Sequence, residues 1–112
     1  MKALTAAEMR EVDRLTTERY GIPSLQLMEA AGKHVADAVL REFAPQLPQR
    51  VTVLCGKGNN GGDGLVAARY LRAAGTNPRV CLFADPREMH GDAGANLASY
   101  LEEAHEIGRA HV

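Results

Sequence analysis

The sequence predicts an α/β fold: a three-layer α/β/α arrangement with a parallel sheet, preceded by two helices. Two apolar runs rich in β-branched residues, 51–55 and 79–83, alternate with helical patterns, and a glycine-rich loop follows the first run. Strands that alternate with helices are joined by crossovers and form parallel sheets, and helices normally cover both faces of such sheets. The 112 residues suffice for one domain at most.

The first predicted helix runs from about residue 6 to residue 19. Thr5 and Glu8 have the spacing of a capping box, in which each side chain binds the backbone of the other residue. The residues that follow at helical spacing are Met9, Val12, Leu15 and Thr16. Gly21 then supplies a C-terminal stop.

The second helix is predicted over residues 24–43. Its apolar stripe consists of Leu27 or Met28, Ala31, Val35, Ala38 and Val39. Gly32 interrupts this stripe at a cost of about 1 kcal/mol relative to alanine, so we interpret it as a point of close helix packing. Met9 and Met28 are interpreted as core residues. His34 is interpreted as a surface or half-buried helix residue, and Glu29 as a solvated or packed carboxylate.

The rest of the chain alternates strand and helix. Runs 51–55 and 79–83 are predicted as strands buried on both faces, because their apolar residues are nearly continuous. Helical spacing resumes at Leu65, ends before Gly75 and returns over 91–103. Because two strands cannot support four helices, the chain either is part of a larger domain or completes itself with a partner. Its ending favours the first alternative, so we expect residues 1–106 to be the N-terminal part of a longer domain. Residues 107–112 resemble a translated sequencing adapter and are interpreted as a non-native tail, the alternative being an ordinary frayed end.

Composition excludes several classes of function. Thirteen basic residues against fourteen acidic ones, few aromatic residues and no tryptophan argue against nucleic-acid binding. No apolar run approaches the roughly 20 residues of a membrane span, and the N-terminus lacks the apolar core of a signal peptide. Cys55 and Cys81 form neither a metal-ligand spacing nor a disulfide framework, which favours the reducing cytoplasm. Cys55 is interpreted as a small packing residue.

The loop over residues 56–64 contains five glycines, in the order Gly56-x-Gly58-x-x-Gly61-Gly62-x-Gly64. The first part of this order is the dinucleotide-binding fingerprint, here between a predicted strand and a predicted helix. Glycines permit a tight turn and a close approach of phosphate to the backbone, and the start of the following helix favours an anion. Asp85, at the end of the second predicted strand, could hold a ribose hydroxyl.

Polar side chains distinguish this loop from an ordinary fingerprint. Asn59, Asn60 and Asp63 supply oxygen ligands that suit a hard cation. Asp63 is either only the cap of the following helix or a cap that also contacts a ligand. Lys57 does not complete a P-loop and is interpreted as a rim charge that could assist an anion. His90 is interpreted as a turn residue that could also line the loop.

The segment 55–64, Cys-Gly-Lys-Gly-Asn-Asn-Gly-Gly-Asp-Gly, resembles the signature of the NAD(P)H-hydrate epimerases, the YjeF N-terminal domain. Segments 5–9, 27–32 and 91–93 resemble helices of the same family, so that the resemblance covers about residues 3–106. It implies a Rossmann-like fold and a homodimeric enzyme that interconverts the R and S forms of hydrated NADH and NADPH. It also implies that Asn59, Asn60, Gly61, Gly62 and Asp63 contact the substrate and that Asn60 binds a potassium ion.

The family's domain is roughly twice as long as this chain, so the resemblance places the acid/base residues downstream of the fragment. The sequence supplies no convincing pair for proton transfer, and we expect the fragment alone to be inactive. In many bacteria an ADP-dependent dehydratase follows this domain. Two other functions stay open: a nicotinamide-dependent oxidoreductase that uses Gly56, Gly58, Gly61 and Asp85, and a non-catalytic binding module of the same fold.

Overall fold

The structure is a computed structural model that describes residues 3–43 and 51–107. Its elements in chain order are α1 (Ala6–Tyr20), α2 (Ser24–Phe43), β1 (Thr52–Cys55), α3 (Asn59–Ala73), β2 (Arg79–Leu82), the 3-10 helix η2 (Pro86–Glu88) and α4 (Gly91–Ile107). β1 and β2 pair in parallel, with Val53 opposite Val80 and Cys55 opposite Leu82. The predicted α/β class and the parallel pairing are therefore confirmed.

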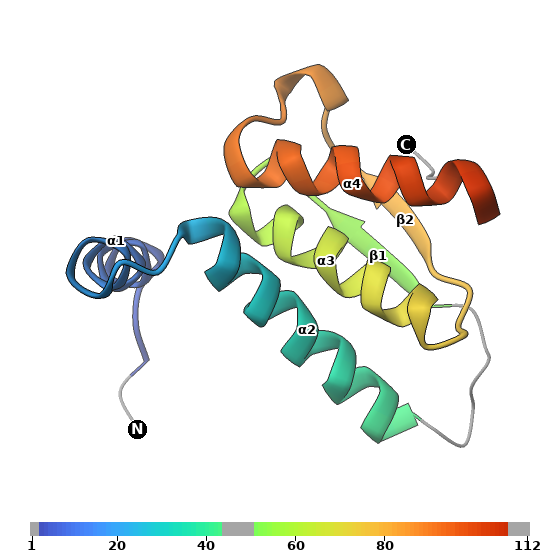
Figure 1. The fold of residues 1–112 in the computed structure, drawn as a ribbon, viewed down its shortest axis with the longest axis horizontal. Helices are drawn as coiled ribbons and strands as arrows, with labels where there is room; N and C mark the ends of the chain where they lie inside the picture. Colours follow the sequence, from blue (N-terminus) through green and yellow to red (C-terminus); the bar gives the residue numbers. More distant parts are fainter. Residues whose placement is uncertain (1–2, 44–50, 108–112) are drawn as a thin grey trace.

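Three helices form one layer against the two-stranded sheet. α3 lies between α2 and α4 and packs on β1, and all three helices lie on the same side of the strands (Figure 1). Alternate strand residues point to this layer, because successive side chains of a strand face opposite sides. Val80, Leu82 and Cys55 are buried there.

The other face of the sheet is uncovered in the described part of the chain. Leu54 in β1 is 65% exposed, and Phe83, just after β2, is 72% exposed. The strands are thus buried on one face only, which differs from the predicted burial on both faces. The apolar runs alone could not reveal this, because periodicity measures what a strand can bury and not what is packed against it.

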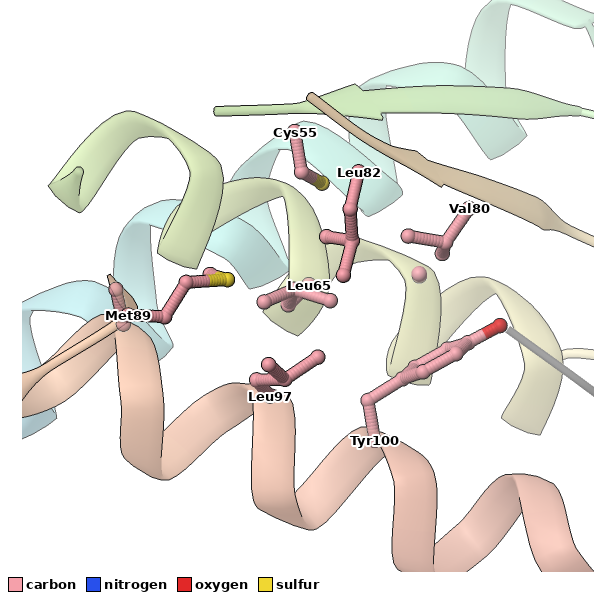
Figure 2. Packing of buried hydrophobic residues seen from close by; sticks show 9 residues of the cluster. Cys55, Leu65, Val80, Leu82, Met89, Leu97 and Tyr100 are labelled. Atoms are coloured by element: carbon pink, nitrogen blue, oxygen red, sulfur yellow. The ribbon is translucent and has the colours of Figure 1, made fainter. Parts of the chain in front are cut away.

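The main core fills the space between the sheet, α3 and α4. Figure 2 shows Leu65 of α3 and Leu97 of α4 packed beneath Val80 and Leu82, with Met89 closing one end and Tyr100 the other. The Tyr100 ring is fully buried, and the Arg72 guanidinium lies 4.2 Å from its centroid and donates to its hydroxyl group. A second cluster joins Ala36 of α2 to Ala67 and Leu71 of α3.

α2 has the predicted bounds, but its buried stripe is displaced from the expected one. The buried residues are Met28, Gly32 and Ala36, whereas Val35 is 51% exposed. Gly32 confirms the expected close approach, because a Cβ there would lie 2.8 Å from the carbonyl oxygen of Asp63. His34 is exposed, as predicted. The stripe follows Gly32, since α3 comes nearest where no side chain intervenes.

α1 begins with the predicted capping box. The Thr5 amide donates to Glu8 Oε1 at 3.0 Å, and the Glu8 amide donates to Thr5 Oγ1 at 3.1 Å. Gly21 ends the helix in the left-handed conformation, with φ of 66°. All residues of α1 are described and none is buried, so the interpretation of Met9 as a core residue is wrong. The helix stands to one side of the layer formed by α2, α3 and α4 (Figure 1).

α4 extends four residues beyond its predicted end, to Ile107. The residues at its end, Glu-Glu-Ala-His-Glu, mostly have good helix propensity, which explains the extension. The predicted tail over 107–112 lies outside the described residues except for Ile107. Of the helices that the structure describes, none is long and apolar enough to cross a membrane.

Candidate functional site

The predicted loop after β1 is largely helical. α3 begins at Asn59, six residues before the predicted start, and its N-cap is Gly58, which has no side chain to form a capping hydrogen bond. The Gly62 amide donates to the Gly58 carbonyl oxygen at 3.1 Å, which closes the first turn. Asp63 is therefore the fifth residue of the helix, and its predicted role as the cap is wrong. The five predicted site residues, 59–63, together form the first turn of α3.

Two glycines let this turn sit against its surroundings. A Cβ on Gly61 would lie 2.8 Å from the carbonyl carbon of Gly56 and 3.0 Å from its nitrogen. A Cβ on Gly62 would lie 2.6 Å from Met28 Sδ and 3.1 Å from the Cα of Ala93. The approaches of 2.8 Å at 61 and 2.6 Å at 62 are too short for a real side-chain carbon. At 61 the obstacle is backbone, whereas at 62 it is mainly the end of the Met28 side chain. The end of β1, α2 and α4 thus all meet the first turn of α3.

A crevice of about 500 Å³ opens beside this turn, at the carboxyl ends of the strands. It is lined by Lys57, Gly58, Asn59, Glu88, His90 and Ala93. The amides of Asn59, Asn60 and Gly61 have no carbonyl partner within the helix, because the first turn of a helix leaves its donors unpaired. These donors and the positive end of the helix dipole favour an anionic group at the crevice. Lys57 on its rim adds positive charge, as the sequence indicated.

A smaller cavity of about 200 Å³ lies on the other side of the same turn. Its polar lining comprises Asp13, Ser24, Asn59, Asp63 and Asp92, and its apolar lining includes Leu27 and Met28. Asn59 lines both cavities. Burial, followed by the charge of Asp13, raises the pKa of Asp63 above the ordinary value. Among the residues that the structure describes, no group of three acidic, histidine or cysteine side chains is placed to hold a metal ion.

The raised pKa of Asp63 makes a pH-dependent contribution to stability. A carboxyl group whose pKa is higher in the folded state stabilises the fold fully below its unfolded pKa, near 3.9, and loses this contribution as pH rises through the folded value. Asp63→Asn is therefore expected to raise the free energy of unfolding modestly at pH 7 relative to the parent, and the advantage should disappear near pH 3.5. Urea unfolding at several pH values measures it.

Asp13→Asn is the matched variant for this prediction. Removing the Asp13 charge should lower the pKa of Asp63 toward its ordinary value, and so yield a smaller gain of the same sign. A loss of stability at pH 7 in Asp63→Asn would contradict the assignment of burial as the dominant cause.

Two acidic side chains outside the turn, Asp85 and Glu29, form ion pairs in the structure. Asp85 caps η2 by accepting from the Arg87 amide at 2.9 Å, and it forms an ion pair with the Arg87 side chain at 2.7 Å. Arg87 lowers the pKa of Asp85. Its carboxylate is thus occupied, and it does not line the crevice. Glu29 is a packed carboxylate, one of the two predicted alternatives, since it is partly buried and pairs with Arg69.

His90 and Glu88 line the crevice, although the sequence analysis interpreted His90 mainly as a turn residue and did not single out Glu88. One signal could have found them: the segment after β2 must leave from the same sheet edge as the glycine turn, because parallel strands end together. Cys55 is buried, and burial raises the pKa of its thiol to about 11, which confirms its interpretation as a packing residue.

The fold and the site together define an α/β protein in which a glycine-rich turn links a parallel strand to a helix and faces an anion-favouring crevice. Comparison with known families is consistent with this class: the family described as YjeF-related protein N-terminus matches residues 24–111. The chain belongs to this family. The resemblance noted in the sequence is therefore confirmed.

Individual relatives agree. The chain is 48% identical over 101 residues to the bifunctional NAD(P)H-hydrate repair enzyme Nnr of Moorella thermoacetica, and it covers 19% of that protein. It is 49% identical over 106 residues to the NAD(P)H-hydrate epimerase of Limosilactobacillus fermentum, and it covers 49% of that protein. The crystal structure of yeast ynu0 superposes with a TM-score of 0.78 at 33% identity, over 99% of this chain and 47% of the yeast chain. The chain thus spans half or less of the length of these relatives.

Proposed function

We propose that this chain carries the substrate-binding turn of an NAD(P)H-hydrate epimerase, which interconverts the R and S forms of hydrated NADH and NADPH. The observation that carries the proposal is the first turn of α3, whose helix amides and polar side chains border the crevice at the strand ends. Relatives named NAD(P)H-hydrate epimerase support the substrate class. The Moorella relative is named a bifunctional NAD(P)H-hydrate repair enzyme, and this supports a repair role in a protein with a second activity.

In this proposal the first turn of α3 binds the anionic part of the substrate. The amides of Asn59, Asn60 and Gly61 donate to phosphoryl oxygens, and Gly58, which lines the crevice, lets the ligand approach the backbone. Asn59 and Asp63 contact the hydrated dinucleotide through their side chains. Epimerisation also requires groups that transfer protons at the hydrated carbon, and we assign no described residue to that role.

We also propose that Asn60 is one ligand of a potassium ion. Its side chain is exposed at the first turn of α3, and an amide oxygen is the kind of ligand that hard cations prefer. The donor type fits the ion, but the described residues supply only this one assigned side-chain ligand. The ion would supply a fixed positive charge beside the turn, while the chain's own amides hold the substrate.

Three finer features belong to the same proposal. A third layer on the exposed sheet face is supported by Leu54 and Phe83, since apolar side chains there would be removed from water. A homodimer is supported by the family resemblance alone. A cytoplasmic location is supported by the free thiols of Cys55 and Cys81.

In the direct experiment, the purified chain and a full-length gene product that contains it are incubated separately with the S form of NADPH hydrate. Chromatography then follows the appearance of the R form. The proposal expects epimerisation by the full-length protein and binding of the hydrate by the chain. Tight binding of unmodified NADPH with hydride transfer would favour an oxidoreductase. Binding without turnover in the full-length protein would favour a non-catalytic module.

Asn60→Ala is expected to weaken potassium dependence and turnover together in the full-length protein, because the variant removes one oxygen ligand. Potassium titration at fixed substrate concentration measures both effects, with an expected rise of about tenfold in the half-saturating potassium concentration for about 1.4 kcal/mol of lost binding. Asn77→Ala is the matched control, since Asn77 is exposed and lies before β2, at the other end of the strand from the crevice. An unchanged titration for Asn60→Ala would remove Asn60 from the ion site.

A further inference from the structure

The side chain that presses on the glycine turn comes from α2. Met28 is 5% exposed, and its thioether lies where the Cβ of any larger residue at 62 would stand, at 2.6 Å for Sδ and 2.7 Å for Cε. Methionine has a flexible side chain that by itself fixes no single position. The close fit against Gly62 therefore requires something that holds the thioether in place.

Asn96 of α4 makes that contact. Its Nδ2 donates to Met28 Sδ at 3.1 Å and to the Asp92 carbonyl oxygen at 3.1 Å. Its Oδ1 accepts from Arg69 Nη2 at 3.2 Å, and Arg69 in turn pairs with Glu29 of α2. Asn96 is 5% exposed, so this buried amide is joined to α2, α3 and its own helix at once. A buried polar side chain with both of its ends engaged has one strongly preferred orientation.

From this arrangement we propose that Asn96 is a positioning residue for the substrate-binding turn and acts through the sulfur atom of Met28. Asn96 orients the thioether, and the thioether packs on Gly62. The first turn of α3 is thereby held with Gly61 against Gly56. The amides of the turn then face the crevice in one geometry before substrate binds, so the turn does not have to become ordered during binding. This inference rests on the proposed function for its effect on substrate, but the positioning itself concerns only the fold.

The first test is Asn96→Leu, which removes the amide at nearly constant volume and leaves Arg69 paired with Glu29. Hydrogen exchange of the Gly62 and Asp63 amides, the first in the turn that are hydrogen-bonded within the helix, is expected to accelerate about tenfold. In the full-length protein the KM for the hydrate should rise by a similar factor, with a much smaller change in kcat. Tyr100→Phe is the matched control, since it removes another buried α3–α4 hydrogen bond, near the far end of α3. It should lower the melting temperature but leave exchange of the Gly62 and Asp63 amides unchanged.

The second test is a double-mutant cycle with Met28→Leu, a conservative core substitution that removes the sulfur acceptor. Met28→Leu alone should accelerate exchange of the Gly62 and Asp63 amides, and it keeps the test available if Asn96→Leu fails to fold. When Met28→Leu is already present, adding Asn96→Leu should change the exchange rate of these amides by less than twofold.

Two results would overturn the proposal. One is a full acceleration of exchange by Asn96→Leu in the Met28→Leu background, and the other is an equal acceleration of exchange in Tyr100→Phe. An absence of epimerisation by the full-length parent would remove the proposed function alone, because the exchange measurements would still decide the role of Asn96.

Discussion

Gly61→Ala is expected to destabilise the protein by about 1–3 kcal/mol, even though alanine is the better helix former by about 1 kcal/mol. The added Cβ would stand 2.8 Å from the carbonyl carbon of Gly56 and 3.0 Å from its nitrogen. These are backbone atoms at the end of β1, so no side-chain rotation can relieve the contact. The first turn of α3 must shift away from the strand, which should also weaken binding of the hydrate.

Thermal unfolding of the variant measures this loss, since 1 kcal/mol corresponds to about 4–8 °C in a domain of 60–100 residues. Gly58→Ala is the matched control for stability, because no atom lies within 4 Å of its added Cβ and its φ of −91° suits any residue. Its melting temperature should change by much less. Equal losses in the two variants would mean that general flexibility of the segment, and not the contact with Gly56, makes glycine necessary at 61.

Leu65→Ala is expected to have the largest effect on stability, a loss of about 2–5 kcal/mol. Leu65 is completely buried in the core between the sheet, α3 and α4, one turn after Gly61 (Figure 2). Truncation leaves a cavity that the fully buried Tyr100 and Val80 cannot fill without moving the helix or the strand. Because small domains are stabilised by only about 5–15 kcal/mol, this loss should unfold a large fraction of the molecules at 37 °C.

Urea unfolding with linear extrapolation measures the difference in the free energy of unfolding between Leu65→Ala and the parent protein. Leu101→Ala is the control, as Leu101 lies on α4 and is 40% exposed. The same chemical change there should cost less than about 1 kcal/mol, since surface substitutions seldom have large effects. A small loss for Leu65→Ala would contradict the central place of α3 in the fold.

Much of the local structure could be predicted because it depends on neighbours in the sequence. The bounds of α2, the capping box of Thr5 and Glu8, and the stop at Gly21 were all correct. So was the pairing of two parallel strands through a helix. Capping, turn conformation and apolar spacing are properties of a few consecutive residues, and their energies are nearly independent of the rest of the chain.

The start of α3 shows where this reasoning fails. Glycine and asparagine are poor helix formers, so the stretch 59–63 was predicted as loop, yet it is helical. Its stability comes from Gly56, Met28 and Ala93, which pack against the turn from three separate elements. Asp63 could not be distinguished from a cap for the same reason. The displaced buried stripe of α2 and the exposure of Met9 have a similar origin, since each depends on which other element packs against the helix.

Local motifs and their order along the chain were enough to identify the family and the α/β class, and they predict the five residues of the candidate site. Tertiary structure alone decided that these residues form a helical turn, that His90 and Glu88 face the same crevice, and that Met28 and Asn96 support it. The physical reason is that such contacts join residues distant in sequence, and their energies exist only when several elements pack together.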